Sequence, residues 1–260
     1  MNLKPWILVS ALSLIFFLEG IFPHMRGRQQ RLRHALPHLA NALINGLIAG
    51  VFLGWLTWYA VGWSEDHSFG IARWIKAPSP VTGLISILIF DAYTYFWHRA
   101  NHRFDFLWRF HRAHHSDTMM DSTTALRFHP GELVLSSVFR VPVIALTGIG
   151  LTELYIFEIA LSTLTLFHHS NLGLGQRTDR VVRLFITSPD MHRIHHSLVL
   201  SEMNSNFTSI LSLWDRLFGT FREKDDTSRI VFGLTGFRKE RWQGFAGFML
   251  SPFINEEQAK

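Results

Sequence analysis

The histidines of this sequence are gathered into short groups with regular spacing. The groups are HRANH with His98 and His102, HRAHH with His111, His114 and His115, HHSN with His168 and His169, and HRIHH with His192, His195 and His196. Residues spaced i, i+3 and i+4 share one face of a helix, so each group can direct two or three imidazoles toward one point. Imidazole binds iron, zinc, copper and nickel. Because so many imidazoles exceed what one ion can take, the spacing predicts two ions with four or five ligands each.

Four other histidines are isolated and lie near the ends of apolar runs. They are His24, His34, His38 and His67. A single histidine at such a position carries no spacing signal, and we do not expect these four to bind metal.

The composition favours a membrane protein and narrows the chemistry. Hydrophobic residues make up 48% of the 260 residues and charged residues 17%, whereas soluble domains average roughly 25% charged. The absence of cysteine excludes disulfides, thiolate metal sites, iron–sulfur clusters and cysteine nucleophiles. A net charge of +5 is compatible with nucleic-acid binding, but the Lys and Arg residues flank apolar runs, which is the membrane pattern. We therefore expect a membrane partner and no nucleic acid.

Apolar stretches predict an all-α integral membrane bundle of about three spans plus a helical hairpin, with a cytosolic helical cap that carries the histidines. The expected spans are 6–22, 36–63 and 81–97. The hairpin is 133–150 with 151–167, and it either crosses the membrane fully or is a shallower re-entrant hairpin. In the second span Gly46, Gly50 and Gly54 form a small-residue face suited to close helix packing. The chain is expected to be a single membrane domain, with N-terminal spans at 1–80, a catalytic region at 81–221 and a cytosolic tail at 222–260.

The basic loop after the first span sets the orientation. Arg26, Arg28, Arg31 and Arg33 lie between two apolar runs, which places this loop in the cytoplasm. Counting spans from there puts every histidine group on the cytoplasmic side of the membrane. The lack of cysteine and the C-terminal sequence EEQAK favour a bacterial inner membrane, with the endoplasmic reticulum as the alternative.

The order of these motifs resembles the fatty acid hydroxylase/sterol desaturase superfamily. H-x-x-x-H, H-x-x-H-H and H-x-x-H-H follow hydrophobic spans in the same order, over roughly residues 85–221. The supporting stretches are RFHPGE at 127–132, FHHSNL at 167–172, SPDMHRIHHS at 188–197, and NF at 206–207 followed by WDRLFGT at 214–220. The resemblance implies a di-iron, oxygen-dependent enzyme that hydroxylates or desaturates a membrane lipid.

The same resemblance assigns metal ligands. It implies the ligands His98, His102, His111, His114, His115, His169, His192, His195 and His196. Some relatives carry two histidines four residues apart on the helix that ends at His169, but this chain has Thr165 at the earlier position. Either His168 substitutes or one ion has fewer protein ligands. His129, in the RFHP element, is a candidate ligand or a residue that orients ligands; the alternative is helix initiation beside Pro130.

Two acidic residues inside the apolar runs are further candidates. Asp91 lies seven residues before His98 and on its helix face, and Glu158 shares a face with Thr165 and His169. An ionisable group inside a membrane span is a functional candidate, so these carboxylates either orient ligands, line a lipid cavity or hold two helices together as a neutralised pair. Asp117 and Asp121 are candidate acceptors for imidazole N–H groups.

An unactivated C–H bond requires a redox metal, which favours iron over zinc, although purified protein can carry zinc because histidine sites are not selective. Molecular oxygen would be the co-substrate. No fused electron-transfer domain is visible, so a separate donor protein is expected, attracted by Arg99, Arg103, Arg109 and Arg112. The alternatives are a histidine-rich metal transporter, which would distribute ligands through the spans, and a zinc hydrolase, which would carry H-E-x-x-H.

Overall fold

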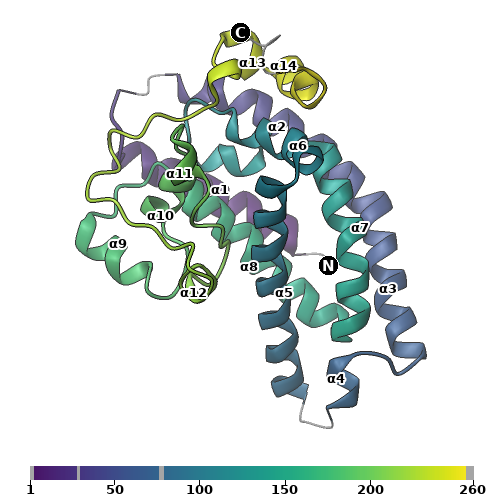
Figure 1. Cartoon of the computed structure of the whole chain (residues 1–260). Coiled ribbons are helices and arrows are strands. Elements are labelled where there is room, and N and C mark those ends of the chain that lie inside the picture. The colour runs from purple at the N-terminus through teal and green to yellow at the C-terminus, as the bar shows by residue number, and fades with distance from the viewer. Residues whose placement is uncertain (1–2, 28–29, 76–78, 256–260) are drawn as a thin grey trace.

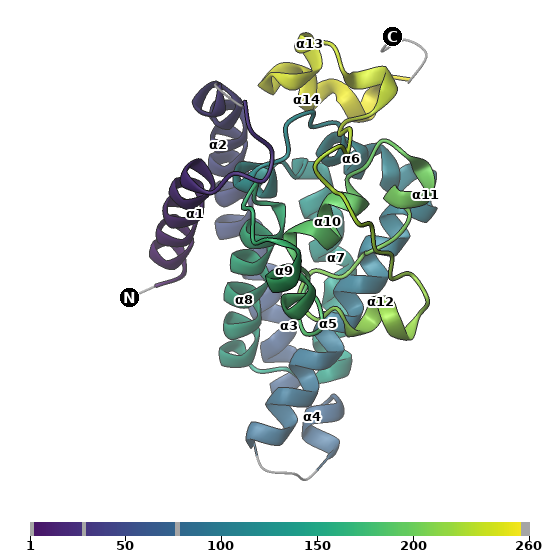
Figure 2. The same cartoon turned by 90° about the vertical axis from the view of Figure 1, so that its left-hand side faces the viewer.

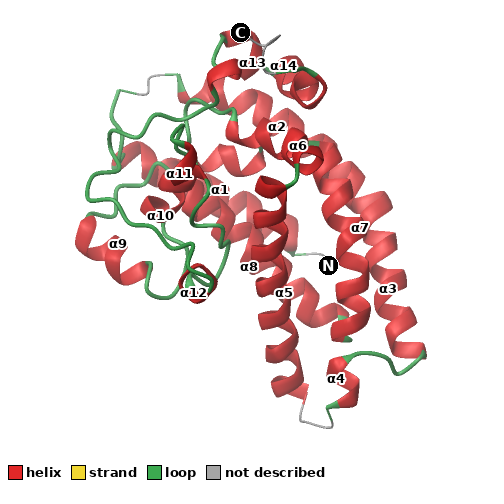
Figure 3. Cartoon of the chain, in the orientation of Figure 1, coloured by secondary structure: helices red, strands yellow, loops and turns green. Residues whose placement is uncertain are grey.

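A computed structural model describes residues 3–27, 30–75 and 79–255, and within those ranges the chain is helical with no strand. The α-helices are α1 (Lys4–Ile21), α2 (Arg31–Ile48), α3 (Gly54–Asp66), α4 (Ile71–Trp74), α5 (Ser79–Arg103), α6 (Asp105–His115), α7 (Pro130–Thr147), α8 (Leu151–His169), α9 (Gln176–Val182), α10 (Pro189–His195), α11 (Leu200–Met203), α12 (Leu213–Leu217), α13 (Glu240–Gln243) and α14 (Phe245–Leu250). Short 3₁₀ turns cover Ser122–Leu126, Thr235–Phe237 and Ser251–Phe253. The predicted all-α class is therefore confirmed (Figure 3).

Three helices among the described residues are long and apolar enough to cross a membrane: α1, α5 and α7. Much of their apolar surface is exposed, including Trp6 and Phe17 on α1, Leu84 on α5 and Phe139 on α7. Exposed apolar side chains on long helices are what a hydrocarbon environment allows. The chain is therefore an integral, multi-pass membrane protein by the length and composition of its helices.

The expected second span and the second arm of the hairpin depart from the simple prediction. Residues 31–66 form consecutive helical segments in which α2 and α3 are joined by a π-helical turn at Ala49–Leu53, and α2 itself is amphipathic, with Arg31, Arg33 and His34 in its first turn. α2 does not reach the hydropathy of a span, because polar side chains interrupt it, and α3, with 13 residues, is too short to cross a membrane by itself. In α8 the acidic residues Glu153 and Glu158 have the same effect.

The long helices run side by side and form one hydrophobic core. Figure 1 shows α3, α5, α7 and α8 extending toward α4 at one end, while α13 and α14 lie at the other end. Phe90 of α5 meets Phe157 of α8 edge to face, with ring centroids 5.5 Å apart, and Ala60, Val61 and Ile144 complete the centre of this core. This packing fixes α5 and α8 relative to each other, and their C-terminal ends carry histidines.

The hairpin turn between α7 and α8 is held by two glycines. Gly148 ends α7 in the left-handed conformation with φ of 65°, and Gly70, which precedes α4, has φ of 110°. A Cβ atom on Gly70 would lie 2.6 Å from the Gly148 Cα, so the close approach of these two loops requires glycine. The contact joins the α3–α4 loop to the end of the bundle farthest from the histidines (Figure 1).

The small-residue face expected in the second span is not packed within the described chain. A Cβ atom added to Gly46 or Gly50 would meet no atom within 4 Å, and one on Gly54 would meet only the Ala49 carbonyl oxygen of its own helix. The expectation of close packing there is wrong for this chain by itself. Arg28, part of the predicted basic loop, and residues 256–260 of the predicted tail lie outside the described residues.

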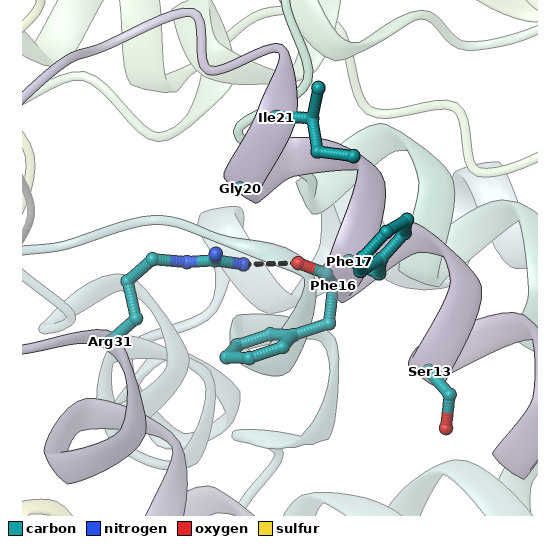
Figure 4. Close-up of a pocket in the computed structure, with 6 residues that line it drawn as sticks. All are labelled: Ser13, Phe16, Phe17, Gly20, Ile21 and Arg31. Atoms are coloured by element: carbon teal, nitrogen blue, oxygen red, sulfur yellow. Dashed lines mark hydrogen bonds between the residues drawn. The ribbon is translucent and has the colours of Figure 1, made fainter.

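A shallow groove separates α1 from α2 (Figure 4). Phe16, Phe17 and Ile21 line it from α1, and Arg31 of α2 donates a hydrogen bond to the Phe16 carbonyl oxygen while its guanidinium lies 4.0 Å from the Phe16 ring centroid. Arg31 also forms an ion pair with the buried carboxylate of Glu19 at 2.8 Å. These contacts stabilise the packing of α1 against the start of α2.

Candidate metal centre

Four helices carry the clustered histidines to one place. α5 and α8 bring His98, His102 and His169 at their C-terminal ends, and α6 and α10 bring the two H-x-x-H-H motifs. α10 begins where Pro189 fixes the first helical residue and the Ser188 hydroxyl accepts the Met191 N–H at 3.3 Å, a regular N-cap. α10 packs against α8, next to the ends of the long helices that carry histidines (Figure 2).

Nine imidazoles form two groups whose ligand atoms lie within 4.8 Å of one another in each group. The first group is His98, His102, His111, His115 and His195, and the second is His114, His169, His192 and His196. The groups adjoin, because the rings of His115 and His196 stack with centroids 4.4 Å apart. All nine residues were expected as ligands, and the fold brings all nine together; their ligation remains a proposal.

The two H-x-x-H-H motifs are each divided between the groups. In α6, His111 and His115 belong to the first group and His114 to the second; in α10, His195 belongs to the first group and His192 and His196 to the second. The i, i+4 pair of each helix therefore faces one ion position and the remaining histidine faces the other. The spacing in the sequence predicted convergence, but it did not predict this division.

The distances between ring nitrogens fit a shared ion. His111 Nε2 lies 3.1 Å from His98 Nε2 and 3.2 Å from His115 Nε2. His169 Nε2 lies 3.0 Å from the Nε2 atoms of His114 and His192. Two imidazoles bound at right angles to one ion, each at about 2.1 Å, have their nitrogens about 3 Å apart. The donor sets therefore fit two transition-metal ions.

The opposite ring nitrogen, Nδ1, is held by an acceptor in four of the nine histidines. His98 donates to the Phe207 carbonyl at 2.7 Å, His195 to the Ser205 carbonyl at 2.8 Å, and His169 to the Thr165 carbonyl at 2.7 Å. His111 donates to the Glu132 carboxylate at 2.7 Å. Because the proton sits on Nδ1, the lone pair of Nε2 points into the group, as metal binding requires.

Burial favours the neutral form of five imidazoles on or next to α6 and α10. It lowers the pKa of His114, His115, His192, His195 and His196 well below the usual value for histidine. Neutral imidazole is the form that binds metal. The Nε2 atoms of His102, His195 and His196 are buried and have no hydrogen-bond partner among the described residues, an arrangement that costs free energy unless an ion fills it.

Glu132 is a functional candidate that the sequence motifs did not single out. It lies in the first turn of α7, is 6% exposed, and accepts hydrogen bonds from His111 Nδ1 and from Asn101 Nδ2 at 3.3 Å. A carboxylate that receives the second N–H of a ligating histidine fixes its ring and raises its basicity. The signal was present in the RFHPGE stretch, where Glu132 lies three residues after His129.

The loop that supplies the Ser205 and Phe207 carbonyls is fixed by Asp215 of α12. This carboxylate is fully buried and accepts hydrogen bonds from Phe207 N at 2.9 Å, Thr208 N at 3.0 Å and the Thr220 hydroxyl at 2.7 Å. The neighbouring Arg216 does not pair with this carboxylate and donates to the carbonyls of Ser212 and Arg183. Asp215 therefore holds the loop that orients His98 and His195.

Replacing Asp215 with Ala is expected to destabilise the protein, because two buried backbone N–H groups lose their acceptor. At about 1–3 kcal/mol for each unsatisfied donor, the apparent melting temperature in detergent should fall by roughly 5–20 °C. The exposed Asp226, replaced in the same way, serves as the control and should leave the melting temperature unchanged. Equal melting of D215A and the parent protein would contradict this role.

The two carboxylates in the apolar runs lie outside both histidine groups. Asp91 accepts hydrogen bonds from Leu211 N at 3.2 Å and Trp214 Nε1 at 2.7 Å, so it fastens the segment before α12 to α5. Glu158 receives the ammonium of Lys4 at 3.1 Å and the guanidinium of Arg140. Asp91 and Glu158 thus have separate partners and join different helices, rather than forming a pair with each other.

His168 and His129 also lie outside both groups. The ring of His168 packs on His192, with centroids 4.1 Å apart. His129 is the N-cap of α7: its Nδ1 accepts the Gly131 N–H at 3.0 Å, and its Nε2 lies 3.2 Å from the Met249 carbonyl oxygen. The geometry of His129 matches helix initiation beside Pro130.

A third cluster contains two of the isolated histidines. His34 bridges Asp117, at 2.8 Å from Nε2, and Asp121, at 2.9 Å from Nδ1. His38 lies 3.0 Å from the Thr123 hydroxyl and accepts from Arg127 at 3.1 Å. The arrangement has the spacing of a metal site, but each ring nitrogen already has a protein partner. The two aspartates therefore tie α2 to the loop after α6, and they face His34 rather than the clustered imidazoles.

Comparison with known proteins agrees with this geometry. The model of the family described as fatty acid hydroxylase matches residues 83–220, which include all nine histidines. Ornithine lipid hydroxylase from Rhizobium tropici is 28% identical, over 95% of this chain and 74% of its own length. Human alkylglycerol monooxygenase is 27% identical over 79% of this chain and 44% of its own length, and rat cholesterol 25-hydroxylase is 26% identical over 58% and 50%. The chain thus spans half or less of the last two relatives. No solved structure matches it.

Proposed function

Because the chain belongs to the fatty acid hydroxylase family, an oxidoreductase family of membrane lipid hydroxylases, we propose that it hydroxylates a membrane lipid at a di-iron centre with molecular oxygen. The observation that carries this proposal is the pair of adjoining histidine groups, whose free Nε2 atoms converge while several Nδ1 atoms are held by protein acceptors. The three relatives named above are hydroxylases or monooxygenases by name, which favours hydroxylation over desaturation.

Iron is the ion that suits both the donors and the chemistry. Nine imidazoles without thiolate suit several first-row metals, and zinc supplies no redox chemistry. Iron in this position would activate oxygen for attack on an unactivated C–H bond. Zinc in purified protein would not contradict the proposal, because histidine donors do not select between these metals.

The chain's own residues position and shield the centre. His98, His195 and His169 are fixed through backbone carbonyls, and His111 is fixed through Glu132, so their rings cannot rotate away. The histidines of α6 and α10 are buried, which excludes bulk water from the reacting atoms. Because α5 and α8 carry ligands at one end and exposed apolar surface along their length, an acyl chain can approach the centre from the bilayer.

A separate electron donor is part of the proposal, and the structure corrects one residue of its expected docking surface. Arg99, Arg103 and Arg109 are exposed on α5 and α6. Arg112 is 6% exposed and donates to the carbonyls of Ser251 and Ile254, so its expected place on the surface is wrong. We propose that the three exposed arginines attract an acidic donor protein on the cytoplasmic side.

The substrate to test first is an acylated amino-acid lipid, since ornithine lipid hydroxylase matches almost the whole chain. The full chain, purified in mild detergent, is reloaded anaerobically with ferrous iron and given ornithine lipid, reductant and ¹⁸O₂. We expect a product 18 mass units heavier per hydroxyl, by mass balance for one inserted ¹⁸O atom. The same assay with an alkylglycerol and a sterol distinguishes the lipid classes. Fewer than one iron per chain after reconstitution would contradict the di-iron proposal.

A further inference from the structure

The two histidine groups follow the same plan, and one position of that plan is missing. The first group takes an i, i+4 pair from α5, an i, i+4 pair from α6 and one histidine from α10. The second group takes the i, i+4 pair of α10 and one histidine from α6, but only His169 from α8. Exchanging α5 with α8 and α6 with α10 relates the two sets, and it predicts a fifth imidazole four residues before His169.

Thr165 stands at that position. It lies one turn before His169 on the same helix face, as His98 lies before His102. In α5 both imidazoles reach the same group, with ring centroids 5.3 Å apart, so this spacing is sufficient in this molecule. The Thr165 hydroxyl donates to the Leu161 carbonyl at 2.7 Å, and its own carbonyl accepts from His169 Nδ1. Thr165 thus orients His169 but supplies no nitrogen.

His168 does not replace the missing imidazole. Its ligand atoms lie outside the second group, because the ring packs against the ring of His192, with centroids 4.1 Å apart. The neighbouring residue on a helix points about 100° away from His169, which explains why a histidine at 168 cannot serve the position that 165 would serve.

We propose that the two ion positions are unequal. The second position, bounded by His114, His169, His192 and His196, has one nitrogen ligand fewer than the first and an additional coordination position on the α8 side, beside Thr165. It therefore holds its ion more weakly and offers more room to a small exogenous ligand. This inference rests on the proposed di-metal function and adds to it that the exchangeable ion is the one bound next to α8.

The test is a chelator titration of the metal-loaded, full-length protein, with cobalt(II) as the probe. Cobalt per chain is counted by mass spectrometry after each chelator step. Loss of a hydrogen-bond partner of a metal ligand lowers metal affinity by about 10–100-fold. A missing ligand should therefore make the two cobalt ions dissociate at chelator concentrations that differ by at least about tenfold. The parent chain is expected to lose one cobalt early and one late.

Substitutions at 165 assign the early loss. Thr165→His supplies the missing imidazole, so the chelator concentrations that remove the first and the second cobalt should then differ by only a few-fold. The matched control Thr165→Val should keep the difference of the parent chain. His168→Gln should also keep it. A single-stage loss of both ions from the parent chain, or identical titrations for T165H and T165V, would overturn the inference. Loss of the second ion in H168Q would assign the fifth ligand to His168 and overturn it as well. Failure of any chain to bind cobalt would instead refute the di-metal function.

Discussion

Replacing His114 with Ala is expected to abolish lipid hydroxylation while leaving the helical bundle intact. His114 provides one of four nitrogens in the second group, at 3.0 Å from His169 Nε2, and its ring stacks on Phe128. Mutation of a residue that only hydrogen-bonds to a metal ligand lowers metal affinity by about 10–100-fold. Removing a ligand itself should lower the affinity by at least about 100-fold. Turnover should therefore fall by about a hundredfold or more, with about one ion fewer per chain, as measured by product formation and metal analysis.

The matched control is His129→Asn. His129 lies near the centre but caps α7 through Nδ1, and Asn is also a good N-cap, so this variant should keep its metal and its melting temperature. If H114A retained both ions and full turnover, His114 would be removed from the ligand set. If H129N lost metal, His129 would have to be counted among the residues of the site.

Replacing Glu132 with Leu is expected to release the ion of the first group. Without the carboxylate, His111 Nδ1 has no fixed acceptor, and the ring loses its orientation and part of its basicity. We expect metal affinity of that group to fall about 10–100-fold, so that the first position becomes the weaker of the two in a chelator titration.

Glu132→Gln is the conservative control, because its amide oxygen can still accept from His111. The metal affinity of the Glu132→Gln variant should stay within a few-fold of that of the parent protein. If the negative charge itself were required, the affinity would fall as it does in the Leu variant. Equal retention of metal by the Leu variant and the parent would show that Glu132 does not position His111.

The sequence by itself determined which segments gather at the candidate metal centre. Imidazoles repeated at i, i+3 and i+4 must share helix faces, and apolar runs of span length must place the ends of those helices at a membrane surface. Eight of the nine candidate ligands lie in such repeats, whereas His169 was chosen over His168 only through the resemblance to a known family. The fold brings all nine together, and the all-α class follows from the apolar runs. Local spacing was sufficient for the eight because each of those inferences concerns one helix at a time.

Only the tertiary structure decided how those residues are distributed. Whether His114 or His115 faces a given ion depends on the angles at which α6 and α10 cross α5 and α8, and a helix alone does not contain this information. The partners of the imidazoles likewise come from distant segments, since Glu132 lies 21 residues after His111 and the Phe207 carbonyl 109 residues after His98.

The charged residues show the same limit. Asp91 and Glu158 looked alike in the sequence as acids inside apolar runs, yet one binds the Trp214 indole and the other lies between Lys4 and Arg140. Arg112 appeared to belong to the basic surface but is buried under the C-terminal residues Ser251 and Ile254. Burial and partner choice depend on which segments pack over a side chain. The sequence, together with the family resemblance, named nine candidate histidines, and the packing of four helices determined their division into five and four.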